Sequence, residues 1–386
     1  MCRLVFTLLV CLAGPAFAEA PGWVTTFASG SEPAGVTALA DGSSVIAYTA
    51  TPCALTGKQD EVPDFRNRMA IAKVNAAGKT VYDVEIPRPK EVLAMLRGPS
   101  TGVVGGITAL SDGDLIVVAE FIEGYPWLIR LDGDSGGVRF SKFIGDTKGN
   151  TVIVSVAADG DDVVIGGGRE SDMYVARYSG NGQKRWEQVV NAGGVEAVNA
   201  LAVMSDGSVV ATAMVQPAPG ATYPQAIIIR LDKDGRTLGQ RRFEGESPVL
   251  AVTRNSIGVA YEDLPPKKQT LRVKVLDTAL AELAEVPFDG TFTAKRLVAQ
   301  NDSFQLLYAG EDKIRMMSLS SRGKQQGDRE VFAARFAIQM SAAVAGNSVY
   351  VAFIAGLETE DGKVCSKAHL VRIPLTTASS SWKGIR

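Results

Sequence analysis

The chain contains a single histidine, His369, and histidine is the side chain used most often for general acid–base catalysis. It lies in the stretch Ala368–Arg372, at the position that Ile227 occupies in an earlier, similar stretch. A Ser-His-Asp triad needs a nucleophile held beside the histidine, and a zinc site needs several His or Cys ligands. We therefore interpret His369 as a partly buried strand residue. The sequence predicts no metal site, no cofactor and no assignable catalytic residue.

Two acidic, glycine-containing stretches resemble the beginning of a calcium-binding loop. They are Asp132–Gly136 and Asp232–Gly235. Neither is followed by a glutamate at the spacing that an EF-hand requires. Both match a tight turn in the other copies of a repeat, so we interpret them as hairpin turns.

A basic residue recurs at one position of this repeat. A ring of such charges could bind an anion, but the strand that carries them is predicted to lie away from the centre of the fold. Each is therefore interpreted as a member of a local ion pair, or as an aliphatic stem with an exposed charge. The members are Lys73, Arg130, Arg177, Arg230, Lys274 and Arg372, with Ser318 in the remaining copy.

The repeat that positions these residues is a tight polar turn followed by a run of apolar residues. Subtracting the positions of successive turns gives steps of 71, 47, 47, 49, 46 and 45 residues. A period in the forties indicates an array of supersecondary units. The turns begin at Asp41, Asp112, Asp159, Asp206, Asn255, Asn301 and Gly346.

The fourth copy, residues 198–243, predicts the content of one unit. Its apolar runs at 200–203, 208–214, 225–231 and 237–243 are joined by turns that suit hairpins, because Asp-Gly tolerates positive φ. The second run of the copies does not alternate apolar with polar residues, so both of its faces must be covered. We predict an all-β fold, a seven-bladed β-propeller of four-stranded antiparallel blades.

A propeller ring leaves open sheet edges unless its first and last blades are joined. Residues 21–30 resemble residues 183–193, a predicted outer strand that precedes an inner one. We predict that this N-terminal segment completes the last blade. Residues 381–386, which carry Trp382, are the alternative.

Residues 1–18 have the features of a secretory signal peptide, with Arg3, an apolar stretch and a small-residue cleavage site at Ala16–Ala18. Residues 19–386 would then form one exported propeller domain, periplasmic or extracellular, without a membrane span. The formal net charge of −2 argues against nucleic acid or an anionic membrane as the main partner. We expect a monomer.

Cys53 and Cys365 are the two cysteines that remain after removal of the signal peptide. An oxidising compartment favours a disulfide between them. They follow the second strands of the first and seventh blades, which become neighbours only if the ring closes. The predicted disulfide would therefore join the two blades at the closing seam.

The copies share a recognisable pattern. It consists of an aromatic outer strand, a glycine-rich joint, a turn of the type "ALA-x-DG-x-VV" and a strand ending "R-L-D-x-x-G". The stretches 186–207 and 226–235 carry it, with weaker copies at 36–47 and 68–78. The pattern resembles the secreted bacterial propeller repeats of the SBBP and delta-60 type, within the quinoprotein-like propeller class. Such repeats occur in exported proteins of unrelated function, so the resemblance implies the fold rather than an activity.

The candidate binding residues lie where the repeat is interrupted. Insertions at residues 51–67 and 87–102 extend the first blade, and both are predicted to open on one face of the propeller. Long loops are also predicted at residues 216–224, 263–269 and 357–367. Function concentrates on such loops when a rigid scaffold holds them. The polar and aromatic candidates are Asp60, Glu61, Asp64, Arg66, Lys90, Arg97, Glu123, Tyr125, Trp127, Arg169, Glu170 and Asp172.

These observations favour a non-enzymatic binding or scaffold module that recognises a protein or glycan partner in the cell envelope through this face. One alternative is a propeller hydrolase or lyase that uses carboxylate and arginine residues at the mouth of the central channel. A structural component of envelope assembly is the other alternative.

Overall fold

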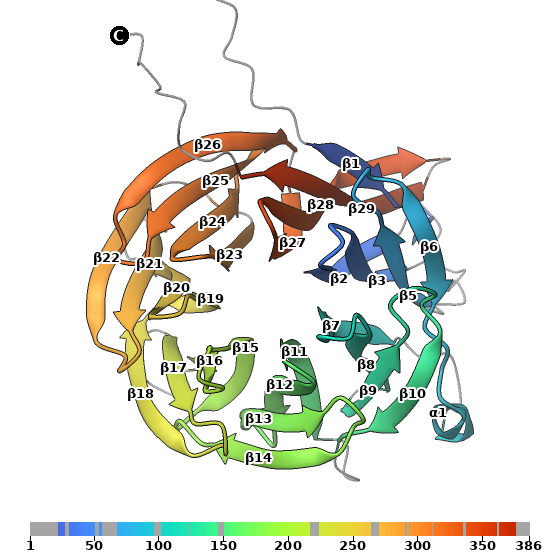
Figure 1. Cartoon of the computed structure of the whole chain (residues 1–386), viewed down its shortest axis with the longest axis horizontal. Helices are drawn as coiled ribbons and strands as arrows, with labels where there is room; N and C mark the ends of the chain where they lie inside the picture. The colour runs from blue at the N-terminus through green and yellow to red at the C-terminus, as the bar shows by residue number, and fades with distance from the viewer. Residues whose placement is uncertain are drawn as a thin grey trace, which may run out of the picture.

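The computed structural model shows seven antiparallel sheets arranged in a ring, with inner strands around the centre and outer strands at the periphery (Figure 1). The predicted seven-bladed β-propeller with four-stranded blades is confirmed. The structure describes residues 22–27, 31–50, 54–55, 68–95, 102–122, 124–145, 150–216, 224–263, 270–289, 292, 294–310, 312–334, 337–360 and 363–375.

The strands follow one another from the inside of each blade to the outside. The first blade consists of β2 (Ser31–Ala38), β3 (Ser44–Ala50), β5 (Arg68–Val74) and β6 (Thr80–Glu85). The second consists of β7 (Val103–Ala109), β8 (Leu115–Ile122), β9 (Tyr125–Leu131) and β10 (Val138–Phe143), and the third of β11 (Thr151–Asp159), β12 (Asp162–Arg169), β13 (Asp172–Ser179) and β14 (Lys184–Val190). The fourth consists of β15 (Val195–Val203), β16 (Val209–Gln216), β17 (Gln225–Leu231) and β18 (Thr237–Glu244), and the fifth of β19 (Glu246–Val252), β20 (Ser256–Asp263), β21 (Thr270–Asp277) and β22 (Glu282–Asp289).

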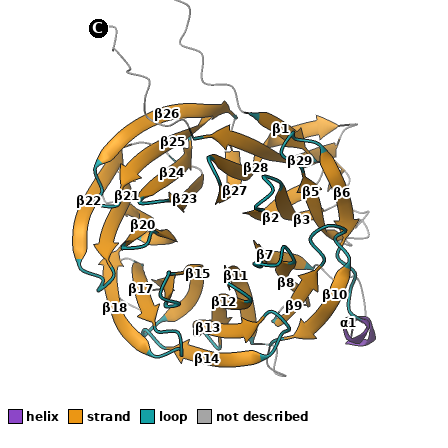
Figure 2. Cartoon of the chain, viewed as in Figure 1, coloured by secondary structure: helices purple, strands orange, loops and turns teal. Residues whose placement is uncertain are grey.

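The last two blades complete the ring. The sixth consists of β23 (Ala294–Gln300), β24 (Ser303–Ala309), β25 (Lys313–Ser320) and β26 (Gln325–Ala333). The seventh consists of β27 (Ala337–Ala345), β28 (Ser348–Glu360), β29 (Lys363–Pro374) and β1 (Trp23–Thr26), and the short strand β4 (Ala54–Leu55) also pairs with β29. Figure 2 shows the helix α1 (Lys90–Met95) at the outer edge of the ring. No helix in the described part of the chain is long and apolar enough to cross a membrane.

The hydrophobic core lies between neighbouring blades. One cluster joins Val45 and Ile71 of the first blade to Val117 of the second, and another joins Ile46 of the first blade to Leu370 of the seventh. The second strands are buried on both faces, since each is covered by a blade on either side. This stacking explains why these strands show no alternation of apolar and polar residues.

The first and seventh blades meet through the N-terminal strand. β1 pairs with β29, with Trp23 opposite Arg372 and Thr26 opposite His369. The Tyr350 hydroxyl of the seventh blade donates to the Gly42 carbonyl of the first at 2.8 Å. Apolar packing and hydrogen bonds therefore cross this seam as they cross the other blade boundaries.

Two tryptophans of outer strands make the same contact with the blade that follows. The indole Nε1 atoms of Trp23 and Trp186 each donate to a carbonyl in an outer turn of the next blade, at 3.0 and 2.7 Å. Each ring also covers a glycine of that turn, Gly78 or Gly235, whose φ angles are 84° and 85°. A Cβ atom at either glycine would lie less than 3 Å from the indole, so the turn requires glycine for its conformation and for this contact.

Candidate functional site

The long connections belong to one face of the propeller and are concentrated on the first blade. Residues 51–67 join β3 to β5, and residues 86–102 lead from β6 to β7. The hairpin of β28 and β29 is long, because these strands continue to Glu360 and restart at Lys363, and β4, the described part of the first connection, pairs with β29. The sequence predicted a loop over residues 357–367, and the structure has this strand extension there instead.

The candidate residues of the second and third blades lie at or beside short connections. The middle strands of the second and third blades are joined by the short connections 123–124 and 170–171. Six of the predicted binding residues, together with Cys53, lie outside the described residues. These six are Asp60, Glu61, Asp64, Arg66, Arg97 and Glu123.

The two aromatic candidates of the second blade lie in one cluster. Trp127 is only 6% exposed and packs against Phe121 and Phe143, with ring centroids 6.5 and 5.8 Å apart. Tyr125 is half-buried and stacks on Phe143 at 5.9 Å. Trp127 is therefore a core residue, contrary to its interpretation as a contact residue, because a strand position next to a short turn faces the neighbouring blade here.

Arg169 is committed to the third blade. Its guanidinium lies over the Tyr174 ring, 3.9 Å from the centroid, and donates to Thr151 Oγ1 and Glu187 Oε2, both at 3.2 Å. Burial alone would raise the pKa of Glu187, but the hydrogen bond from Lys184 and the charge of Arg169 hold it below its usual value. Arg169 of β12 thus contacts the other three strands of its blade, and its charge is paired with Glu187.

The connection between β12 and β13 contains unusual backbone. Glu170 and Ser171 have φ angles of 50° and 75°, which are left-handed conformations that L-residues adopt at a cost. Asp172, which follows them, accepts from Asn191 Nδ2 at 2.8 Å. Lys90, the remaining described candidate, is exposed at the start of α1. The structure therefore does not gather Lys90, Arg169 and Asp172 into one constellation.

Replacing Ser171 by glycine is expected to raise the free energy of unfolding by about 0.5–1 kcal/mol, because a two-residue hairpin turn with positive φ prefers glycine at its second position. Urea denaturation at fixed pH measures this change. Ser171→Ala is the matched control, since alanine retains the backbone strain and should give no gain. A glycine variant no more stable than the wild type would contradict this account of the turn.

Exposed aliphatic side chains lie at the mouth of the ring on the same face as the long connections. Val103, Val152 and Ile338 stand at the beginning of the inner strands β7, β11 and β27, and they are 40–47% exposed. Inner strands begin where the chain arrives from the preceding blade, which is the face that carries residues 86–102. These three side chains therefore place apolar surface on both sides of the first blade.

A cavity of about 200 Å³ lies on the axis and is lined by the inner strands of all seven blades. Val36, Ile107, Leu201 and Leu297 contribute to its walls. The described lining contains no Asp or Glu, and Arg296 is its one charged residue.

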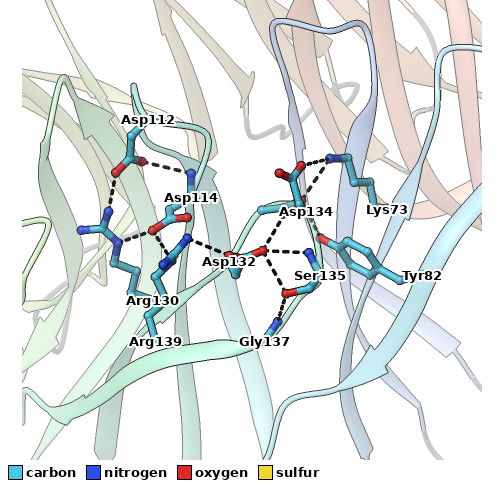
Figure 3. A network of polar contacts seen from close by, with 11 residues as sticks. Lys73, Tyr82, Asp112, Asp114, Arg130, Asp132, Asp134, Ser135, Gly137 and Arg139 are labelled. Carbon is cyan, nitrogen blue, oxygen red and sulfur yellow. Dashed lines mark hydrogen bonds and ion pairs between the residues drawn. The ribbon is translucent and has the colours of Figure 1, made fainter.

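The opposite face carries a repeated hydrogen-bond network (Figure 3). Lys73 Nζ of the first blade donates to the Gly133 carbonyl and to Asp134 in a turn of the second, at 3.0 and 3.2 Å. Arg130 of the second blade donates to the Gly180 carbonyl of the third at 3.0 Å, in addition to binding carboxylates of its own blade. The predicted ion pairs are confirmed for five of the recurring basic residues, Lys73, Arg130, Arg177, Arg230 and Lys274. Lys73, Arg130, Arg177 and Arg230 also contact the neighbouring blade.

A larger hollow of about 530 Å³ lies on this opposite face, over the first three blades, away from the long connections. Its charged lining includes Lys73, Asp112 and Asp134, which are already bound to one another or to Arg130. We therefore regard this hollow as the space between turns that these ion pairs join. The face that carries the long connections remains the better candidate for a binding site.

Ser135 stands in a G-x-S-x-G spacing, Gly133–Gly137, that resembles a nucleophile elbow. An elbow requires a strand-to-helix turn, whereas Ser135 lies in the turn between β9 and β10. Its hydroxyl donates to Asp132 Oδ1 at 2.9 Å, as Figure 3 shows. The chain's only histidine, His369, is in the seventh blade, where its ring stacks on Phe353 at 5.5 Å. Ser135 is therefore a turn residue.

No family model matches the chain, and no curated protein matches it in sequence. Solved structures do resemble it. The hydrazine synthase of Kuenenia stuttgartiensis aligns over 88% of this chain and 95% of its own, with a TM-score of 0.58 and 12% identity. The Dos1 propeller aligns over 91% of this chain and 94% of its own, with a TM-score of 0.53 and 9% identity. At such low identity these similarities establish a β-propeller fold and no activity.

Proposed function

We propose that the chain is an exported, non-enzymatic β-propeller that binds a protein or glycan partner of the cell envelope through the face over its first blade. The observation that carries this proposal is the concentration of long connections there. Residues 51–67 and 86–102 both belong to the first blade, and β4, the described part of the first connection, pairs with the long β28–β29 hairpin. Loops held by a rigid scaffold commonly carry binding residues. Asp60, Glu61, Asp64 and Arg66 remain the proposed polar contacts.

The exposed aliphatic side chains at the mouth of the ring support a protein as the partner rather than a glycan. Val103, Val152 and Ile338 expose aliphatic surface beside the long connections, and interface centres are depleted of charge. The signal-peptide features of residues 1–18 support binding in the periplasm or outside the cell. The repeat motifs of the fourth copy further support membership of the SBBP and delta-60 type.

The alternative functions make different demands on the structure. A hydrolase or lyase that used a pocket at the axis would need paired carboxylates there, and the described lining of the axial cavity has none. A structural role in envelope assembly would not require a specific face. Loss of binding after a change confined to one face therefore separates the proposed function from both alternatives.

Shortening the loop of the first blade tests the proposal. Replacing residues 57–66 by a Gly-Ser pair retains Cys53 and β4, and it is expected to weaken binding to purified envelope fractions at least about 10-fold. Binding is measured as a Kd with the immobilised propeller. The matched control shortens residues 217–223, a connection of the same kind on the fourth blade, and should leave the Kd unchanged. Equal binding by the wild type and the 57–66 variant, with unchanged melting temperature, would contradict the choice of the first blade as the binding region.

A further inference from the structure

Arg296 of β23 is larger than the residue at the corresponding position of each other inner strand. In those six strands the residue is small or medium-sized and faces the next blade. A Cβ atom at Gly35 would lie 3.1 Å from Ile107 Cγ2, and one at Gly106 would lie 3.2 Å from Val156 Cγ1. The corresponding residues of the other six blades are Gly35, Gly106, Ser155, Ala200, Val249 and Ser341.

Between the sixth and seventh blades, the sizes of the two facing inner-strand residues are reversed. Ile107 and Val156, which face the two glycines, are large aliphatic residues, whereas the seventh blade has Ala342 at the same place. The long Arg296 side chain is thus accommodated next to a small residue. Arg296 is the one cation in the described lining of the axial cavity.

Arg296 has no carboxylate partner among the residues that the structure describes. Its one hydrogen bond is the donation from Nη1 to the Lys295 carbonyl at 3.3 Å. The adjacent Lys295 is different, because its ammonium pairs with Glu262 of the fifth blade. Burial lowers the pKa of the Arg296 guanidinium, and no nearby opposite charge offsets this effect.

The polar groups that share the axial cavity with Arg296 can donate hydrogen bonds. Asn199 accepts from the Met214 amide at 2.8 Å through Oδ1, and its described contacts leave the two amide hydrogens without an acceptor. Ser155 and Ser341 also line the cavity. With these donors, one cation and no carboxylate in the described lining, the cavity favours an anion.

We propose that this axial cavity binds a small organic monocarboxylate. The guanidinium of Arg296 would bind the carboxylate through two parallel hydrogen bonds. Leu201, Leu297 and the other aliphatic walls would contact an apolar body, and the volume of about 200 Å³ limits that body to a few carbon atoms. A single cation in aliphatic walls suits one negative charge better than inorganic phosphate. The proposal concerns the axis and does not depend on partner binding at the long loops.

Isothermal titration calorimetry with hexanoate, 1-hexanol and inorganic phosphate tests the proposal on the mature chain. The wild type should bind hexanoate more tightly than hexanol or phosphate. Arg296→Met should weaken hexanoate about 10- to 100-fold and leave hexanol unchanged. Arg254→Met, which changes an exposed arginine in the turn between β19 and β20, is the matched control and should bind like the wild type. Equal hexanoate affinity for wild type and Arg296→Met, tighter binding of phosphate, or no hexanoate binding would each overturn the proposal.

The melting temperature without ligand distinguishes a binding residue from a structural one. Arg296→Met should melt at the same temperature as the wild type or higher, because it removes a charge that has no partner in the protein. A lower melting temperature would assign Arg296 a role in holding the sixth and seventh blades together, and would overturn the proposal.

Discussion

Replacing Arg130 by methionine is expected to lower the free energy of unfolding by about 2–3 kcal/mol, because the guanidinium bridges two blades. It donates from Nε to Asp114 at 2.7 Å, from Nη2 to Asp112, and from Nη1 to the Gly180 carbonyl at 3.0 Å. The Asp114 side chain is only 8% exposed, so loss of Arg130 leaves a largely buried carboxylate with less compensation. Urea denaturation measures the change.

Arg139 provides a matched control for this prediction. Its Nε atom lies 2.7 Å from the same Asp114 carboxylate, but its side chain is 52% exposed and it makes no contact with the third blade in the described contacts. Arg139→Met should therefore cost less than about 1 kcal/mol, the usual value of an exposed pair. Equal losses for the two variants would show that burial and bridging of the blades contribute nothing, contrary to our account.

Of the contacts of Arg130, the sequence could predict those within its own blade but not the one to the next blade. An aspartate in the turn and a basic strand residue, Asp112 and Arg130 in the second copy, occur together in the first four copies, so a local ion pair follows from the repeat itself there. The Gly180 carbonyl, however, is supplied by the neighbouring blade through its backbone, which leaves no signature in side-chain types. Arg177 repeats the arrangement by donating to the Gly207 carbonyl of the fourth blade at 2.7 Å.

The sequence predicted the number and composition of the blades because each blade repeats one hydrophobic pattern and one turn. The repeat is less regular where another physical factor takes the place of a turn glycine or of an apolar strand pattern. In the fifth blade Leu280 adopts a φ of 67° at the place of a turn glycine, and its side chain is buried, so packing compensates for backbone strain. The extension of β28 and β29 was read as a loop because its polar residues gave no strand pattern.

The candidate site was less predictable than the fold, because the sequence does not say which side of a strand faces a neighbouring blade. Trp127 was read as a contact residue and is instead in the core. Arg296 was missed because it is one of many basic residues when read along the chain. It becomes conspicuous only when the seven inner strands are aligned by their pairing register, where the other six residues are smaller.

Reducing the protein, or replacing Cys53 by serine, is expected to lower the free energy of unfolding by about 2–5 kcal/mol if the predicted disulfide joins the first and seventh blades. Cys53 itself lies outside the described residues. The next residue, Ala54, pairs with Val364, which precedes Cys365, and Leu55 pairs with Lys363. The chain after Cys53 therefore runs beside the chain before Cys365. Thermal unfolding with and without reductant, together with a thiol count in denaturant, measures the effect.

A disulfide at this place would act on the unfolded chain more than on local packing, since it would close a loop that contains nearly the whole propeller. The seam already has apolar packing and hydrogen bonds of its own, such as that from Tyr350 to Gly42. The reduced ring should therefore remain folded at low temperature and unfold earlier on heating. A Cys53→Ser, Cys365→Ser double variant must then be as stable as the reduced wild type and indifferent to reductant. Two free thiols in the unreduced protein would refute the disulfide, and the stability of the seam would rest on the contacts between the blades alone.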